Sequence, residues 1–311
     1  MRYSELSAVG PLFEILKLTP VNAGDVTVAA TIPLWAVGKA HLVAKQELVC
    51  AGLQLAEKVF RSLDVEMDLE FQAKDGDLLK KGQQILHLSG NAGAILTGER
   101  TALNFLGHLS GIATLTRKFV AELAGTNARI RDTRKTTPGL RLLEKYAVKV
   151  GGGTNHRIGL FDAILLKENH IALAGGIKPA LDQAHAFASS RMRIRAMTAY
   201  EAAGMAGPAV DEDEGLSIQI EVRNEAELSE ALASGAEAVL LDNMNPEQAR
   251  KCVEIVRATR RECTVEISGG ITIENARAYA LTGADYLSAG ALTHSARSAD
   301  MSLLVDSIGE A

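Results

Sequence analysis

The segment SGAEAVLLD, Ser234 to Asp242, decides the fold of this chain. Its glycine ends a helical pattern, an acidic residue follows, and the apolar run after it predicts a short buried strand. The same order recurs 48 residues further on, in TGADYLSAG, Thr282 to Gly290. An internal repeat of this kind indicates a fold assembled from strand–helix modules.

Outward from this repeat, short apolar runs predict six strands. They are Arg129–Thr133, Ala163–Lys167, Ser217–Val222, Ala238–Leu241, Thr264–Ile267 and Tyr286–Ala289. Helical patterns separate the later strands, at Asn224–Ala233, Pro246–Arg260 and Ile273–Leu281. Alternating strands and helices form βαβ units and a parallel sheet. We therefore expect an α/β fold with a closed or nearly closed barrel, and keep an open doubly wound sheet as the alternative.

The part before about residue 98 predicts a mixed α+β layer. Val26–Val37 and Lys39–Ala44 have the pattern of strands, and Leu48–Leu63 that of a helix. Apolar residues every three or four positions predict a long helix over Glu99–Leu123. We expect Ser110-Gly111 to bend or break this helix.

Bulk composition excludes some classes of protein. A formal net charge of -5 and only 4% aromatic residues argue against nucleic-acid binding. No apolar run approaches the roughly 20 residues of a membrane span, and the first residues lack a signal-peptide pattern. The three cysteines, Cys50, Cys252 and Cys263, are far apart and are expected to be buried in a reducing compartment. The sequence thus predicts a cytoplasmic protein without a membrane or nucleic-acid partner.

One segment departs from the strand–helix rhythm. Phe187 to Gly215 holds three arginines followed by the acidic run Asp211–Glu214. We expect an exposed excursion from the barrel, with a functional lid as the less favoured alternative.

Positive charge is concentrated between Arg131 and His170. This stretch has eight Lys or Arg against four Asp or Glu, in a chain that is acidic as a whole. A local positive field predicts a site for a small anion. Within it, Arg141, Lys145 and Lys149 are expected to serve loops or the surface.

Active sites of α/β barrels lie at the carboxyl ends of the strands. At or near these ends the sequence places cations, carboxylates and glycines. The cations are Arg134, Lys135, Arg157 and Lys167, with His156 near them; the carboxylates are Glu221 and Asp242; the third group is Ser268, Gly269, Gly270 and Gly290. Cations suit a substrate with more than one carboxylate, carboxylates suit Mg²⁺ or a developing cation, and free backbone N–H groups suit a phosphate. Together they suggest glycosyl transfer from a phosphorylated ribose.

Each of these residues also has a plain structural interpretation. His156 could be a buried, hydrogen-bonded core histidine, and Lys167 could form a structural ion pair with Glu168 or Glu221. Gly269-Gly270 could be only a turn.

Four longer motifs resemble those of the quinolinate phosphoribosyltransferase family. They are DTRKTTPGLR (Asp132–Arg141), GGGTNHRIGLFDAILLKENHI (Gly151–Ile171), GERTALNFLGHLSGIAT (Gly98–Thr114) and EISGGI (Glu266–Ile271). The resemblance runs in order from Gly24-Asp25 to His294. It implies an N-terminal α/β sandwich domain over residues 1–110, completed by 292–311, and an open α/β barrel over 111–291.

The resemblance also implies a reaction. Quinolinate and 5-phosphoribosyl 1-diphosphate would give nicotinate mononucleotide, pyrophosphate and CO₂ with Mg²⁺, in NAD biosynthesis. Arg134, His156, Arg157 and Lys167 would bind quinolinate, and Lys135 would lie between quinolinate and the diphosphate. Glu221 and Asp242 would hold the ribose and Mg²⁺, and Ser268, Gly269, Gly270 and Gly290 the 5-phosphate.

The implied assembly is a homodimer with a shared active site, and a hexamer stays open. Arg100, which by default would be a surface arginine at a helix start, would reach into the neighbouring subunit's site. One departure from the family is Arg223, which stands close to Glu221 where an acidic residue is common.

Three other functions compete with this interpretation. The first is the pyrophosphorylase-like relative associated with molybdate transport. The second is a Schiff-base lyase with Lys167 as the nucleophile. The third is a non-catalytic phosphate-binding barrel, which Glu221 and Asp242 disfavour because they would repel the ligand.

Overall fold

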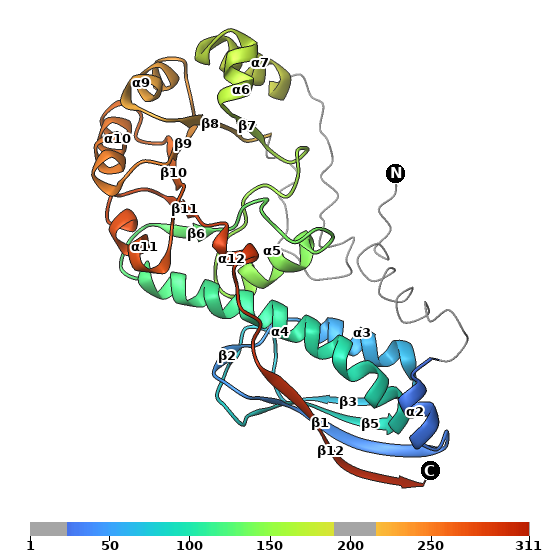
Figure 1. The fold of residues 1–311 in the computed structure, drawn as a ribbon. Coiled ribbons are helices and arrows are strands. Elements are labelled where there is room, and N and C mark those ends of the chain that lie inside the picture. Colours follow the sequence, from blue (N-terminus) through green and yellow to red (C-terminus); the bar gives the residue numbers. More distant parts are fainter. Residues whose placement is uncertain (1–23, 190–215, 311) are drawn as a thin grey trace. The chain divides into compact units, whose positions relative to one another are not determined.

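The computed structural model describes residues 24–189 and 216–310. These residues form two compact units (Figure 1). The first comprises residues 24–117, 146–152 and 296–310, and the second comprises 118–145, 153–189 and 216–295. Most of the predicted excursion, from residue 190 on, lies outside the described residues.

The first unit is built on an antiparallel sheet with the strand order β12-β1-β5-β3. Two short strands, β2 and β4, form a separate antiparallel sheet. The strands are β1 (Ala36–Ala44), β2 (Leu48–Val49), β3 (Asp68–Phe71), β4 (Leu78–Leu79), β5 (Gln84–Asn91) and β12 (Met301–Glu310). The helices are α2 (Val26–Thr31), α3 (Leu53–Leu63) and α4 (Ala92–Glu122).

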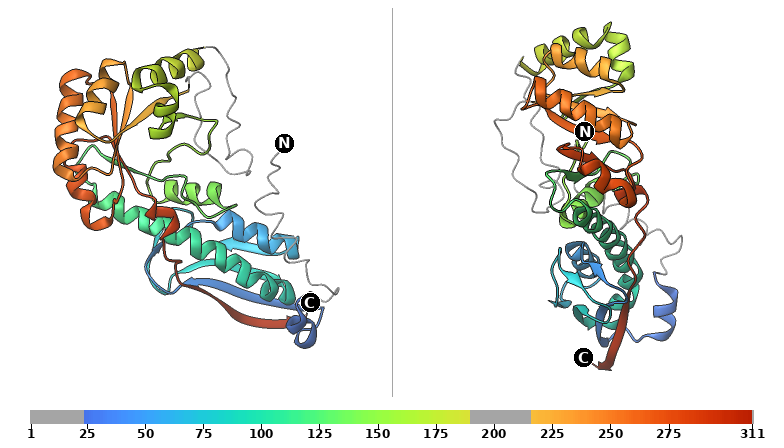
Figure 2. Two further views of the ribbon diagram at one scale, coloured as in Figure 1. Left: turned by 45° about the horizontal axis from the view of Figure 1, so that its top comes forward. Right: turned by 90° about the vertical axis from the view of Figure 1, so that its left-hand side faces the viewer.

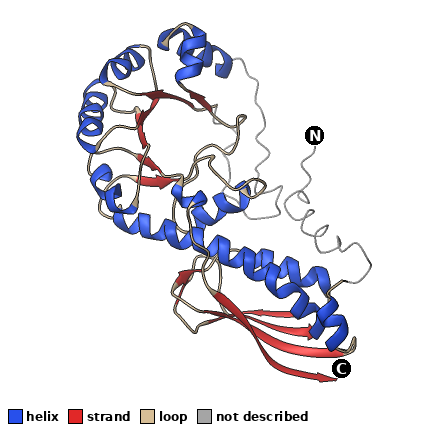
Figure 3. Ribbon diagram, viewed as in Figure 1, coloured by secondary structure: helices blue, strands red, loops and turns tan. Residues whose placement is uncertain are grey.

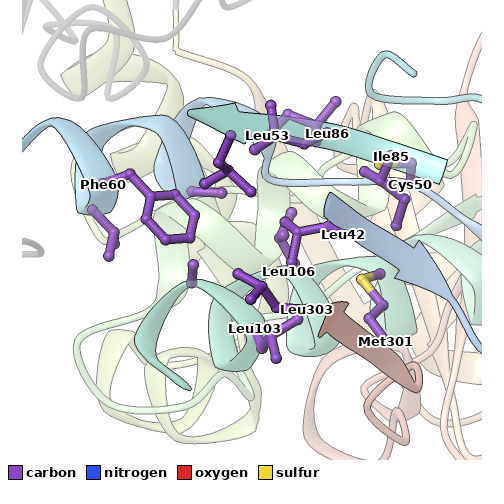
Figure 4. Packing of buried hydrophobic residues seen from close by; sticks show 14 of the residues in the cluster. Leu42, Cys50, Leu53, Phe60, Ile85, Leu86, Leu103, Leu106, Met301 and Leu303 are labelled. Atoms are coloured by element: carbon purple, nitrogen blue, oxygen red, sulfur yellow. The ribbon is translucent and has the colours of Figure 1, made fainter. Parts of the chain in front are cut away.

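The core of this unit lies between the sheet and α3 and α4 (Figure 4). Leu42 from β1, Phe60 from α3 and Leu106 from α4 are all fully buried. Leu303 brings β12 into the same cluster, so the last strand belongs to the core formed by residues far earlier in the chain.

One prediction for this region is wrong, and another is confirmed except at its start. Val26–Thr31 is a helix and not a strand, because the Asp25 carboxylate accepts hydrogen bonds from Thr27 N and Val28 N, both at 3.0 Å. This cap outweighs the strand preference of the β-branched residues. The Leu48–Leu63 helix starts only at Leu53, because Leu48–Val49 pairs with β4 and Gly52 adopts a φ of 103°.

The expected break at Ser110-Gly111 does not occur, and α4 runs through both residues. Ser110 Oγ instead accepts from Ala51 N at 2.9 Å. An added Cβ at Gly111 would stand 2.1 Å from the carbonyl oxygen of Arg297. The glycine therefore lets the chain at Arg297 pass close to the helix.

The second unit is a parallel α/β sheet, as predicted. Its strand order is β6-β11-β10-β9-β8-β7. The first strand of this unit, β6, therefore pairs with β11 and not with β7, and the barrel is open between β6 and β7. The strands are β6 (Arg129–Arg131), β7 (Ile164–Leu166), β8 (Ile218–Val222), β9 (Ala238–Asp242), β10 (Thr264–Ser268) and β11 (Tyr286–Ser288). A single parallel bridge joins Arg131 to Thr154 on the free side of β6.

Helices follow these strands along the chain. They are α5 (Arg141–Val150), α6 (Glu168–Ala174), α7 (Ile177–Ser189), α9 (Glu225–Ala233), α10 (Pro246–Thr259), α11 (Ile273–Ala280) and α12 (Ala291–His294). Figures 2 and 3 show α9, α10 and α11 along the outer side of the strands. The repeat that decides the fold is present: Gly235 and Gly283 end helical segments with φ values of 89° and 91°.

The register of the parallel sheet places a row of polar side chains on one face. Leu240 pairs with both Glu221 and Glu266, and Ser268 pairs with both Asp242 and Ser288. Directly paired residues point to the same face, and residues two apart share it. The alternating positions, such as Val265 and Ile267, are fully buried apolar residues. We therefore assign the apolar face to the helices and the polar face to the inside of the barrel.

Two minor expectations can be compared with the described residues. Cys50, Cys252 and Cys263 are buried free thiols, as predicted. Among residues 24–189 and 216–310, no helix has the length and apolar character needed to cross a membrane.

The close approach at Gly111 generates a stability prediction. Gly→Ala in a helix interior normally stabilises a protein by about 0.5–1 kcal/mol. We expect Gly111→Ala to do the opposite and to lower the free energy of unfolding by about 1–3 kcal/mol, because the methyl group meets the Arg297 carbonyl. Urea unfolding measures the change. Lys118→Ala, at an exposed position of the same helix, is the control and should stay within about 0.5 kcal/mol of the original protein; a stabilised Gly111→Ala protein would contradict the prediction.

Candidate active site

The loops that carry the predicted cations are joined by one buried carboxylate. Asp132 follows β6, is fully buried, and accepts hydrogen bonds from Lys145 Nζ, Asn155 Nδ2 and, at 2.9 Å, His156 N. Burial raises the pKa of Asp132 and lowers that of Lys145, and the opposite charge of each partner counteracts the shift. Lys145, expected in a loop or on the surface, is instead the fully buried counter-charge of this cluster.

Arg141 fixes the same loops from the start of α5. Its guanidinium donates to Thr136 Oγ1 at 3.0 Å, to Arg134 O at 3.3 Å and to Ile158 O at 3.2 Å. One side chain therefore holds the segments on which Arg134 and Arg157 stand.

Arg134 and Arg157 are brought together. Burial lowers the pKa of Arg157, and the nearby charge of Arg134 lowers it further. Arg157 Nη1 donates to Ala163 O at 3.1 Å. Two neighbouring guanidiniums make a field that favours an anion with two carboxylates, which can accept from each planar fork.

Both ring nitrogens of His156 are occupied within the protein. Nδ1 accepts from Arg157 N at 2.7 Å, and Nε2 lies 3.2 Å from Gln219 Oε1 and 3.5 Å from Glu266 Oε1. Burial lowers the pKa of this imidazole, which favours its neutral form. The interpretation of His156 as a hydrogen-bonded interior histidine therefore describes its contacts.

Lys167 and Glu221 meet at the ends of β7 and β8. Lys167 Nζ donates to Glu221 Oε2 in an ion pair, with the lysine side chain 45% exposed and the glutamate 12% exposed. The structural ion pair considered from the sequence is thus present with Glu221. This ion pair lies at the carboxyl ends of the strands, where a ligand can take the place of either partner.

Asp242 and Ser268 end the next two strands and are paired in register. The turn after Ser268 has positive φ at Gly269 (100°) and Gly270 (63°). A Cβ at Gly269 would stand 2.2 Å from Asn243 Oδ1, so only glycine fits there. Asn243 also has positive φ (54°) and donates from Nδ2 to Asp242 Oδ2 at 2.8 Å.

Lys135 lies against the last predicted strand end. Its Cδ would be 3.1 Å from a Cβ added at Gly290, and Thr293 Oγ1 donates to Lys135 O at 2.8 Å. The first and last loops of the barrel mouth are therefore in contact.

Arg100 belongs to the other unit. It is exposed on α4 and lines a cavity of about 250 Å³ together with Asn104, Ser298 and Asp300. The second unit has a cavity of about 310 Å³ beside Glu221, formed by α6, α7 and α9. Arg223 lines this cavity and is paired with Glu168 and Glu227, at 2.8 and 2.9 Å.

Sequence reasoning missed the buried polar residues under the site. Glu266, Gln219 and Arg131 were not singled out, although Glu266 stands in the EISGGI motif. An acidic residue in the middle of an apolar strand run was the available signal, because a buried charge requires partners.

Comparisons with known proteins point to one family. The family models described as "Quinolinate phosphoribosyl transferase" match residues 25–110 (N-terminal domain) and residues 112–208 and 207–304 (C-terminal domain). The chain is 42% identical over 265 residues to a probable nicotinate-nucleotide pyrophosphorylase [carboxylating] of Bacillus subtilis, covering 85% of this chain and 82% of that protein. It is 36% identical over 301 residues to a mitochondrial quinolinate phosphoribosyltransferase [decarboxylating] of Nicotiana tabacum, covering 92% and 78%.

Solved structures of nicotinate-nucleotide pyrophosphorylases are also similar to this chain. The nicotinate-nucleotide pyrophosphorylase of Francisella tularensis has a TM-score of 0.83 and 34% identity, covering 98% of each chain. The corresponding protein of Ehrlichia chaffeensis has a TM-score of 0.77 and 34% identity, covering 96% of this chain and 98% of that one.

The buried Asp132–Lys145 pair generates a second stability prediction. Lys145→Met leaves the Asp132 carboxylate buried without its counter-charge and should cost about 3–5 kcal/mol of unfolding free energy. The Asp132→Asn/Lys145→Met double variant removes both charges and should recover part of that loss. Denaturant unfolding of the singles and the double measures the coupling; a double variant whose loss is the sum of the single losses would show that the charges do not depend on each other.

Proposed function

This chain belongs to the quinolinate phosphoribosyltransferase family, and we propose that the strand ends of its parallel unit carry the reaction of that family. Its activity is that of a carboxylating nicotinate-nucleotide pyrophosphorylase, a pentosyltransferase of NAD biosynthesis. It transfers phosphoribosyl from 5-phosphoribosyl 1-diphosphate to quinolinate, and releases pyrophosphate and CO₂. The observation that carries the assignment of the site is the single Arg141 side chain that holds the segments of both Arg134 and Arg157, together with the Lys167–Glu221 ion pair at the ends of β7 and β8.

Quinolinate is the substrate we assign to the cations. Its two neighbouring carboxylates match two planar guanidiniums, Arg134 and Arg157. Lys167 supplies a further positive charge when its amine leaves Glu221. Lys135, which lies against Gly290, is placed to contact both quinolinate and the diphosphate that departs.

Glu221 and Asp242 face the ribose in this proposal. The ring nitrogen of quinolinate forms a bond to the anomeric carbon as the bond from that carbon to the diphosphate oxygen breaks. Positive charge develops on the ribosyl centre, and fixed carboxylates stabilise it without moving. No protein nucleophile is needed.

The 5-phosphate is assigned to Ser268, Gly269, Gly270 and Gly290. Positive φ at both Gly269 and Gly270 makes a glycine turn directly after Ser268, and we assign the backbone N–H groups of this turn to the phosphate. Decarboxylation follows ring alkylation: the cationic ring nitrogen accepts the electrons of the breaking carbon–carboxylate bond, and a proton then replaces CO₂.

Mg²⁺ is part of the proposal. Among the described residues no group of three or more His, Cys, Asp or Glu forms a cage for a metal ion. Glu221 and Asp242 fit the commoner Mg²⁺ arrangement, in which one or two carboxylates and the substrate phosphates share the ion. These two residues would hold it, directly or through water, and the ion would neutralise the diphosphate charge.

We also propose a cytoplasmic homodimer, with assembly to a hexamer left open. The family resemblance assigns Arg100 to the neighbouring subunit's site. Its exposed position on α4 is compatible with that role.

A Schiff-base lyase is not favoured. A nucleophilic lysine is activated by a desolvated pocket or a neighbouring cation. Lys167 is nearly half exposed and is paired with a carboxylate instead.

The first experiment is product formation. The protein with quinolinate, 5-phosphoribosyl 1-diphosphate and Mg²⁺ should release pyrophosphate and CO₂ and form nicotinate mononucleotide, with EDTA stopping turnover. Arg134→Ala should lower kcat/KM by about 100-fold, the loss of roughly 2.7 kcal/mol of transition-state binding, without moving the unfolding midpoint. Nicotinate in place of quinolinate is the comparison; faster turnover with nicotinate would contradict the proposal.

The shared site is tested by mixing inactive subunits. Arg100→Ala and Asp242→Asn should each be inactive alone. Refolded together, they should recover about a quarter of the original activity, because each mixed dimer then has one intact site. The control combines both lesions in one chain and refolds it with unaltered chain. No recovery in the first mixture would show that Arg100 serves its own subunit.

A further inference from the structure

Glu266 is the centre of a polar network inside the barrel that the proposed reaction does not use. It lies in β10, has no exposed surface and faces the interior. Its carboxylate accepts from Arg131 Nη1 at 3.0 Å, from Gln219 Nε2 at 3.1 Å and from Ser288 Oγ. The Arg131 guanidinium also stacks 3.2 Å above the centroid of the Tyr286 ring.

Such a network is not needed to fill a barrel. A buried carboxylate loses its hydration, and replacing buried charges with apolar residues is often neutral or stabilising. Arg131 Nε is moreover buried without a hydrogen-bond partner among the described residues. Because the Glu266 network costs stability in this way, we look for its function in the residues that Glu266 contacts.

Gln219 connects Glu266 to His156. Because Arg157 N donates to His156 Nδ1, the proton of the neutral ring is on Nε2. Nε2 then donates to Gln219 Oε1, while Gln219 Nε2 donates to Glu266. The carboxylate therefore sets the orientation of the Gln219 amide. The amide oxygen on Nε2 and the Arg157 N–H on Nδ1 together favour the Nε2–H tautomer of the imidazole.

The other arm of the network reaches β6. Arg131 is the last residue of β6 and is followed directly by the segment from Asp132 to Lys135. Glu266 is thus joined by side chains to both segments that carry the paired guanidiniums: to Arg134 through Arg131, and to Arg157 through Gln219 and His156.

We propose that Glu266 is a positioning residue for the quinolinate side of the site: through Gln219 it holds His156 as the Nε2–H tautomer, and His156 in turn holds the backbone of Arg157. This inference rests on the proposed function. It gives His156 a role through Arg157 in place of direct contact with the substrate by a ring nitrogen, since neither nitrogen is free.

Gln219→Met is the decisive variant, because it removes the amide that hydrogen-bonds His156 at 3.2 Å. It leaves the contacts of Glu266 with Arg131 and Ser288, and the longer 3.5 Å approach of Glu266 Oε1 to His156 Nε2. We expect the KM for quinolinate to rise by about tenfold while the KM for 5-phosphoribosyl 1-diphosphate changes by less than about twofold. Glu266→Gln should produce the same split with a larger effect. Asp182→Asn, which breaks the exposed Lys178–Asp182 ion pair on α7 away from this network, is the control and should leave both KM values unchanged.

Nitrogen-15 NMR of the histidine rings tests the geometry without turnover. The His156 signal, identified by its loss in His156→Gln, should report Nε2–H in the original protein and a mixture of tautomers in Gln219→Met. Equal changes in both KM values, a matching effect of Asp182→Asn, or an unchanged tautomer in Gln219→Met would each overturn the proposal. An original protein with the Nε2–H tautomer but no product would instead overturn the proposed function alone.

Discussion

The cation side of this site depends on the neutralisation of one buried carboxylate. Asp132 has no exposed surface, so its charge must be balanced inside the protein. Lys145, on α5, supplies the opposite charge, and Asn155 Nδ2 and His156 N, in the loop after Gly151–Gly153, supply two further hydrogen bonds. In satisfying Asp132, these segments are brought together, and Arg134 and Arg157 become neighbours as a result. The positive field at the strand ends is therefore organised by a negative charge beneath it.

The parallel unit was predictable because its determinants are local. Short apolar runs, helix-ending glycines and polar strand ends can be recognised in sequence, and all six strands lie where the pattern predicts them. The first unit was less predictable: the Asp25 cap overrode the strand preference of Val26–Thr31, and Gly111 serves close packing and not a break. Lys145 and Glu266 were missed because their partners are remote in sequence and are defined only by the fold.

The charged residues of the parallel unit fall into two sets that differ in burial. The exposed or half-buried groups, such as Arg134, Arg157 and Lys167, are those to which substrate contacts are assigned. The fully buried groups, Asp132 and Glu266, contact the protein and hold the first set in place. The carboxylate that opposes the effect of Arg134 on Arg157 is a third one, Asp162, whose charge raises the pKa of Arg157. At the ends of β7 and β8, Glu221 likewise offsets the positive charge of Lys167.

The bridge at Thr154 has a consequence for the open barrel. An open sheet leaves a strand edge whose N–H and C=O groups can recruit another chain. On the free side of β6, Thr154 N and Oγ1 both donate to Ile130 O, at 2.9 and 3.1 Å, and Asp132 N donates to Thr154 O at 3.3 Å. One residue of the returning loop thus covers the edge of this strand. The β6 edge of the open sheet is in this way kept from pairing with another chain.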